Sequence, residues 1–144
     1  MGLNIYKLRW KIEEYFRALK SGCKIGAVRL SSGTKLKKFI AIKSLIAFKI
    51  LYLSKIALSS PEENCNTILT AKEWKTLYIR AHQTSNILNK PPNIKEAITW
   101  LGELGGFVAR KGDKLPGIMA LWRGYEILQE SIVMLSIVSS KIYG

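Results

Sequence analysis

Aspartate is almost absent from this chain of 144 residues. The single aspartate, Asp113, stands in the loop-like sequence ARKGDKLPG, and His82 is the single histidine. Metal-dependent and acid–base active sites usually bring two or more carboxylates or histidines together. Of the nine glutamates, only Glu13 has an unusual setting, among basic residues. The chain alone is therefore chemically incomplete for a site of that kind.

Cysteines and long apolar runs are also scarce. Cys23 and Cys65 form no CxxC pair, which favours reduced core thiols over a disulfide or a metal site. The most apolar stretch, residues 39–58, contains three lysines. Each lysine near the centre of a bilayer costs about 2.5–3.5 kcal/mol. This cost favours a core helix over a membrane span, and we expect no membrane partner.

Positive charge is what the chain has in excess. It contains 23 Lys and Arg against 10 Asp and Glu, so that its formal net charge is +13, and 48% of its residues are apolar. The apolar share suffices for a buried core. The charge suits an anionic partner, such as nucleic acid, an anionic membrane surface or an acidic protein. A membrane surface is disfavoured because the basic residues do not gather on one face of a single helix.

Apolar periodicity predicts an all-α chain of about five helices. Thr70–Glu73 and Asn93–Glu96 each fit a capping box, the pattern that begins many helices. The second helix is apolar nearly all round, which predicts burial on several sides. The expected helices span approximately residues 5–20, 34–58, 71–82, 94–104 and 117–139.

The last expected helix has a heptad-like seam and further apolar residues beside it. Two interpretations stay open: the helix packs on its own domain, or it buries the excess apolar surface against a second chain. The seam consists of Ile118, Leu121, Tyr125, Leu128, Ile132 and Leu135.

The first expected helix has two stripes at helical spacing. The apolar stripe can face a core and consists of Ile5, Leu8, Ile12, Tyr15, Phe16 and Leu19. The charged stripe consists of Tyr6, Arg9, Glu13, Arg17 and Lys20. Here too two interpretations stay open. Glu13 and Arg17 form a solvated ion pair, or Glu13 binds a divalent metal while the cations grip a phosphate backbone.

The charged stripe also resembles a known signature. The spacing Tyr6-x2-Arg9-x3-Glu13-x6-Lys20 is similar to the Y-R-E-K signature of bacterial DDE transposases of the IS-four group, Tn-five type. Trp10 and the Glu13-Glu14 doublet fit the same run. Residues 65–74, 104–111 and 121–129 resemble, in the same order, the C-terminal dimerisation region of that family.

This resemblance implies roles for the stripe. Glu13 would be the third acid of the catalytic triad and a metal ligand. Tyr6, Arg9 and Lys20 would contact transposon-end DNA, with Arg17 and Trp10 beside them. The complete enzyme would use Mg²⁺ or Mn²⁺, and we expect neither ion to bind this chain tightly.

The resemblance also implies an organisation. Residues 1–60 would end an RNase H-like catalytic domain, and residues 61–144 would form a helical dimerisation domain. The dimer contact would involve Leu121, Trp122, Tyr125, Leu128, Ile132 and Leu135.

The chain departs from the family in the two aspartates that a DDE site also needs, since Asp113 lies in a downstream loop. We therefore expect the C-terminal part of a cut-and-paste transposase, inactive alone, whose status as an enzyme stays open. It would act in the bacterial cytoplasm at the nucleoid, as a homodimer or with full-length transposase. The alternative is a non-catalytic protein that pairs with full-length transposase and inhibits it.

Overall fold

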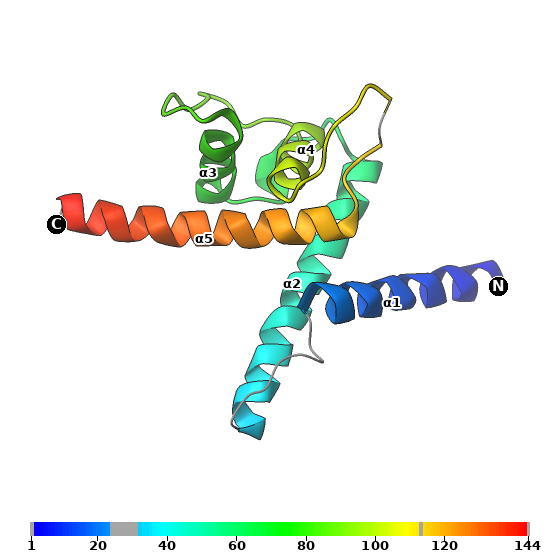
Figure 1. The fold of residues 1–144 in the computed structure, drawn as a ribbon. Coiled ribbons are helices and arrows are strands. Elements are labelled where there is room, and N and C mark those ends of the chain that lie inside the picture. Colours follow the sequence, from blue (N-terminus) through cyan, green and yellow to red (C-terminus); the bar gives the residue numbers. More distant parts are fainter. Residues whose placement is uncertain (1, 24–31, 113, 144) are drawn as a thin grey trace. The chain divides into compact units, whose positions relative to one another are not determined.

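The computed structural model describes residues 2–23, 32–112 and 114–143. These ranges contain five α-helices, a short 3-10 helix and no strand, which confirms the all-α prediction. Figure 1 shows the order along the chain. The helices are α1 (Gly2–Cys23), α2 (Gly33–Ser59), η2 (Cys65–Thr67), α3 (Ala71–His82), α4 (Ile94–Leu104) and α5 (Ile118–Tyr143).

The chain divides into two compact units, Met1–Tyr52 and Leu53–Gly144. Helix α2 runs through the division. The domain boundary predicted at residue 60 falls a few residues further along and stays a prediction.

In the first unit, the apolar stripe of α1 is only partly covered. Ile12 is 54% exposed and Phe16 59%, whereas Tyr15 is half-buried and donates a hydrogen bond from its hydroxyl to the carbonyl oxygen of Ser44 (3.4 Å). Leu19 is also half-buried. The side chains of Ile5 and Leu8 lie outside the described residues. The stripe thus has helical spacing, but not the full burial expected of a core face.

Helix α2 is buried along one face, so the prediction of burial on several sides was wrong. The buried positions recur at helical spacing and are Ala47, Ile50, Leu53 and Ala57. The opposite face leaves large apolar side chains exposed, namely Ile42, Leu45, Phe48 and Tyr52. Apolar composition alone does not fix how many neighbours a helix has. Among the described residues, no helix is long and apolar enough to cross a membrane.

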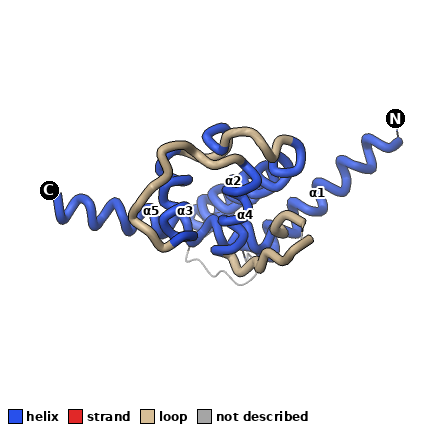
Figure 2. Tube along the Cα trace, turned by 90° about the horizontal axis from the view of Figure 1, so that it is seen from above, coloured by secondary structure: helices blue, strands red, loops and turns tan. Residues whose placement is uncertain are grey.

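In the second unit, α3 and α4 both pack against α5. Figures 1 and 2 show that the C-terminal part of α5 continues past them. The apolar face of α4 is fully buried and consists of Ile94, Ala97, Ile98 and Leu101. Both predicted capping boxes are present. The largest fully buried side chains of this unit include Trp122, Leu77, Ile98, Leu101, Leu121 and Leu128.

Two close contacts hold α3, α4 and α5 together. Helices α4 and α5 cross so closely that a Cβ added at Gly124 would collide with the carbonyl of Leu101. Between α3 and α4, the His82 ring stacks on Tyr78 with centroids 4.2 Å apart, and both rings pack edge-on against Trp100. The single histidine therefore takes part in aromatic packing.

The segment after α2 is tied to the start of α4 by backbone hydrogen bonds. The amide of Cys65 donates to Pro92 (3.0 Å), and that of Ile94 donates to Glu63 (2.8 Å). Cys65 is free and buried, as predicted. The side chain of Cys23 lies outside the described residues.

Candidate nucleic-acid interface and dimer surface

The charged stripe of α1 is solvent-accessible where its side chains are described. Arg9, Glu13, Arg17 and Lys20 are all exposed. The Arg9 Nε donates to Glu13 Oε1 at 3.2 Å, with 74% and 55% of the two side chains exposed. The ion pair thus forms with Arg9 rather than with Arg17. Exposed pairs of this kind contribute about 0.3–0.5 kcal/mol, so Glu13 is held only weakly.

Trp10 and Tyr6 complete the set of residues expected to contact DNA. Trp10 is 63% exposed beside Arg9, an unusual position for a large aromatic side chain. An exposed indole next to cations is suited to stacking on a base or packing against a sugar. The side chain of Tyr6 lies outside the described residues.

The positive charge of the chain is concentrated in the unit that carries this stripe. Residues 1–52 contain twelve Lys and Arg and only two acidic residues, Glu13 and Glu14. Residues 53–144 contain eleven basic and eight acidic residues. Ten of the thirteen net charges therefore belong to the first unit. Such a surface attracts a polyanion at long range.

The described residues do not form a metal site by themselves. Glu13 is a single carboxylate, and Glu14 is rotated about 100° away from it on the helix. No group of three or more His, Cys, Asp or Glu side chains comes together anywhere in the described ranges. A hard divalent ion needs several oxygen ligands. Glu13 can contribute one of them, and further carboxylates have to come from other residues.

Three of the six residues predicted for the dimer contact lie in the core of the second unit. Leu121, Trp122 and Leu128 are at most 1% exposed. In this conformation they have no surface to offer a second chain. The first half of the predicted seam therefore packs within the second unit, and its part in a dimer contact stays a prediction.

Tyr125 and Ile132 are half-buried, whereas Leu135 is exposed. The Tyr125 hydroxyl donates to Glu73 Oε1 at 3.5 Å. Burial, and secondarily the Glu73 carboxylate, raise the pKa of Tyr125 to about 12. The phenol therefore stays protonated at neutral pH and joins α5 to α3.

The C-terminal half of α5 has the apolar surface expected of an association helix. Every residue from Val133 to Ser139 is exposed. Most of them are apolar: Val133, Met134, Leu135, Ile137 and Val138. A monomeric soluble protein rarely exposes so continuous an apolar run.

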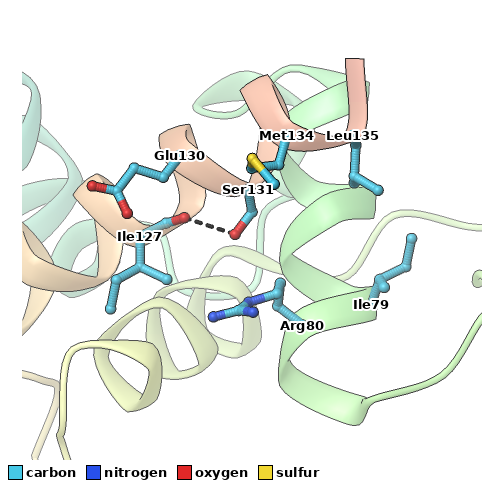
Figure 3. A pocket seen from close by; sticks show the side chains of 7 residues that line it. All are labelled: Ile79, Arg80, Ile127, Glu130, Ser131, Met134 and Leu135. Carbon is cyan, nitrogen blue, oxygen red and sulfur yellow. Dashed lines mark hydrogen bonds between the residues drawn. The ribbon is translucent and has the colours of Figure 1, made fainter. Parts of the chain in front are cut away.

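A groove between α3 and α5 adjoins this run, and the sequence analysis did not identify it (Figure 3). Its cavity measures about 390 Å³. Apolar side chains and two side chains of opposite charge line it: Ile79, Arg80, Ile127, Glu130, Met134 and Leu135. The Ser131 hydroxyl donates a hydrogen bond to the backbone carbonyl of Ile127 (2.7 Å). Groove residues from α3 escape sequence analysis because only the packing of α3 on α5 brings them there.

The described fold and surfaces define a basic helical protein with one face suited to polyanions and one helix suited to association. Comparison with known families agrees with this description. Residues 45–140 match the family Transposase Tn5 dimerisation domain, and residues 2–48 match the family Transposase DDE domain. The first match covers more than half of the chain, so the chain belongs to the Tn5-type transposase dimerisation family.

These matches confirm the resemblance that the YREK spacing and the C-terminal segments indicated. The two matched segments meet at residues 45–48, close to the division between the compact units after Tyr52. The charged stripe of α1 therefore belongs to the DDE-matched segment. The groove and the exposed run of α5 belong to the dimerisation segment.

Proposed function

We propose that this chain serves cut-and-paste DNA transposition as the part of a DDE transposase that binds transposon-end phosphates and pairs two copies of the enzyme. The observation that carries the proposal is the exposed charged stripe of α1, which lies in the DDE-matched segment and in the most basic part of the chain. Arg9, Arg17 and Lys20 extend along one side of the helix. That arrangement suits successive phosphates of one DNA strand.

Glu13 is the residue that would take part in the chemistry. A DDE enzyme uses Mg²⁺ or Mn²⁺ to activate water for strand cleavage and then the 3′-hydroxyl for joining. Glu13 would supply one carboxylate of such a site. Because no group of three or more His, Cys, Asp or Glu side chains gathers around Glu13 among the described residues, we propose that the chain alone neither cleaves nor joins DNA.

The exposed half of α5 would pair two chains and so bring two transposon ends together. A homodimer buries apolar side chains that are otherwise in water. The place of action would be the bacterial nucleoid, where the DNA substrate lies.

The test uses the purified full chain with Mg²⁺, a short duplex DNA of mixed sequence and a duplex carrying a cognate end. We expect binding of DNA by a dimer, measured by sedimentation, and no nicked or joined product on a sequencing gel. Nicking by the chain that disappears in Glu13→Gln would contradict the proposed inactivity. Failure to bind either duplex at low salt would contradict the DNA-binding role.

One observation favours a second candidate function, inhibition of full-length transposase. The association surface of α5 is present, whereas the described residues supply only one of the carboxylates that catalysis needs. A chain of this kind would form mixed dimers that lack one active site. Co-expression with a full-length relative should then lower its transposition frequency, and Met134→Glu should relieve the inhibition. An unchanged frequency would exclude this role.

A further inference from the structure

We propose that a second pocket in the second unit, between α4 and the loop that leads to α5, binds an acidic peptide segment of a partner protein. The segment places one large apolar side chain in the pocket and carboxylates beside Lys95 and Lys114. The pocket shares no residue with the charged stripe of α1 or with the exposed run of α5. A partner bound there is therefore additional to the DNA and the second chain of the proposed function.

The pocket is a cavity of about 310 Å³ with apolar walls. Figure 1 shows the connection from α4 to α5 on the same side of the unit as the C-terminal end of α2, and both contribute to the walls. The apolar lining residues are Leu58, Phe107, Ala109 and Leu115. Since a cavity of about 150 Å³ already accepts benzene, this one has room for a leucine or phenylalanine side chain.

The wall that the loop forms is held on α4 at a single glycine. The amide of Phe107 donates to the carbonyl oxygen of Gly102 (2.9 Å). Pro116 is buried so closely against Gly102 that a Cβ added to this glycine would collide with the proline ring. Phe107, and Leu115 next to Pro116, are thus kept beside α4. A pocket whose walls are already in place loses little conformational freedom when it binds a ligand.

The charge at the pocket favours an anionic partner. Lys95 and Lys114 are both exposed, and none of the residues that line the pocket is acidic. The ion pair found in the described part of the chain, Arg9–Glu13, involves neither lysine. The Thr99 hydroxyl, which also belongs to a lining residue, already donates to the Lys95 carbonyl (2.8 Å). The two ammonium groups are therefore the polar groups that the pocket offers a partner.

The apolar walls favour a peptide over duplex DNA. Phosphate contacts need cations, but a phosphate backbone has no apolar side chain that could fill the cavity. Leu58 is 73% exposed at the pocket and would be covered by such a side chain. A segment with an apolar residue between acidic residues matches the walls and the two lysines together. An apolar centre with a charged rim is also the usual arrangement of a protein interface.

The first experiment measures binding of a fluorescein-labelled peptide, EELFEE, to the full chain by fluorescence anisotropy at physiological ionic strength. Two control peptides separate the two contributions. EEGGEE keeps the charge and lacks the apolar residues, and KKLFKK keeps the apolar residues with the charge reversed. We expect EELFEE to bind at least about tenfold more tightly than either control. Equal binding of EELFEE and EEGGEE would overturn the proposal, because general attraction to a basic protein would explain it. Absence of EELFEE binding would overturn it as well.

The second experiment locates the bound peptide. The pocket variant combines Lys95→Gln with Lys114→Gln. The matched control combines Lys72→Gln with Lys90→Gln, two exposed lysines of the same unit outside the pocket. Both variants lower the net charge from +13 to +11. We expect the dissociation constant of EELFEE to rise about fivefold or more in the pocket variant, and less than about twofold in the control. Equal rises would place the peptide elsewhere and contradict the assignment. Circular dichroism shows that the helices are retained.

Duplex DNA is the alternative occupant, and the same two variants test it. We expect them to bind a mixed-sequence duplex equally well, because their net charges are equal and the pocket lysines serve the peptide. A loss of DNA affinity confined to the pocket variant, with unchanged EELFEE binding, would make these lysines phosphate contacts and remove the peptide site.

Discussion

The buried thiol of Cys65 makes the stability of the second unit depend on pH. Burial raises the pKa of its thiol from 9.0 to about 11. A group whose pKa is raised by folding stabilises the fold below its unfolded pKa, and that contribution is lost as pH rises through the folded value. The free energy of unfolding should therefore fall between about pH 9 and pH 11, by up to about 2–3 kcal/mol from this group.

We predict that Cys65→Ala has a shallower decline of the unfolding free energy over that window, measured by urea unfolding at pH 7.5, 9 and 10.5. Tyr125→Phe is the control. The pKa of Tyr125 is raised from 10.0 to about 12, so this tyrosine contributes to the decline only above about pH 10. Equal declines in Cys65→Ala and the native chain would contradict the assignment.

The two buried tryptophans differ in one hydrogen bond. Trp122 Nε1 donates to Glu126 Oε1 at 3.0 Å, whereas Trp74 Nε1 is buried without a partner among the described residues. Replacing each by phenylalanine removes similar volume, but only Trp122→Phe also breaks a hydrogen bond. We predict that Trp122→Phe loses about 1 kcal/mol more unfolding free energy than Trp74→Phe. A larger loss in Trp74→Phe would show that its indole N–H is satisfied in solution.

At the residue scale, the sequence predicts which side chains share a face but not their partners. Arg9 and Arg17 are both four residues from Glu13, so spacing favours neither, and the structure pairs Glu13 with Arg9. Arg80 was not identified at all, because it reaches the groove only when α3 packs on α5.

At the scale of elements, the crossing of α4 and α5 depends on glycine. A Cβ at Gly124 would meet the backbone carbonyl of Leu101, which cannot yield as a flexible side chain could. We predict that Gly124→Ala lowers the unfolding free energy by about 2 kcal/mol or more, through separation of the two helices. Gly117→Ala is the control, since nothing lies within 4 Å of a Cβ there, and it should change stability by less than about 1 kcal/mol. Chemical denaturation of both variants measures the difference in unfolding free energy. Equal losses in the two variants would contradict the prediction, because they would mean that α4 and α5 can move apart at little cost.

Elements whose ends are set by local contacts were predicted best. The capping boxes that begin α3 and α4 involve residues three positions apart, so the sequence contains the whole interaction. The exposure of one α2 face was not predictable from its apolar composition. The seam of α5 was recognised, but periodicity cannot tell that its first half packs on α3 and α4 while its second half is exposed.

At the scale of the whole molecule, positive charge is concentrated in one of the two units, whereas large apolar side chains are exposed in both. The basic residues dominate the first unit, and the exposed apolar run of α5 lies in the second. Net charge from the sequence predicts a polyanionic partner. Net charge does not identify which cations contact that partner, because side chains that bind neighbouring phosphates have to lie on the same side of the protein surface.

The last prediction distinguishes a specific phosphate-binding face from general basic charge. Arg9, Arg17 and Lys20 are exposed along one side of α1. If each neutralises one phosphate, replacing all three by glutamine should reduce the slope of log affinity against log salt by roughly 2–3. Binding of a mixed-sequence duplex, followed by fluorescence anisotropy from low to moderate salt, gives the slope.

The matched variant replaces Lys72, Lys90 and Arg123, which are exposed on the second unit, by glutamine. It changes the net charge by the same amount, from +13 to +10. Long-range attraction depends on net charge and would weaken equally in both variants, whereas counterion release follows the phosphates actually contacted. A slope reduced only in the α1 variant therefore identifies the charged stripe as the DNA-binding face. Equal reductions would assign DNA binding to the overall charge of the chain and remove the stripe's special role.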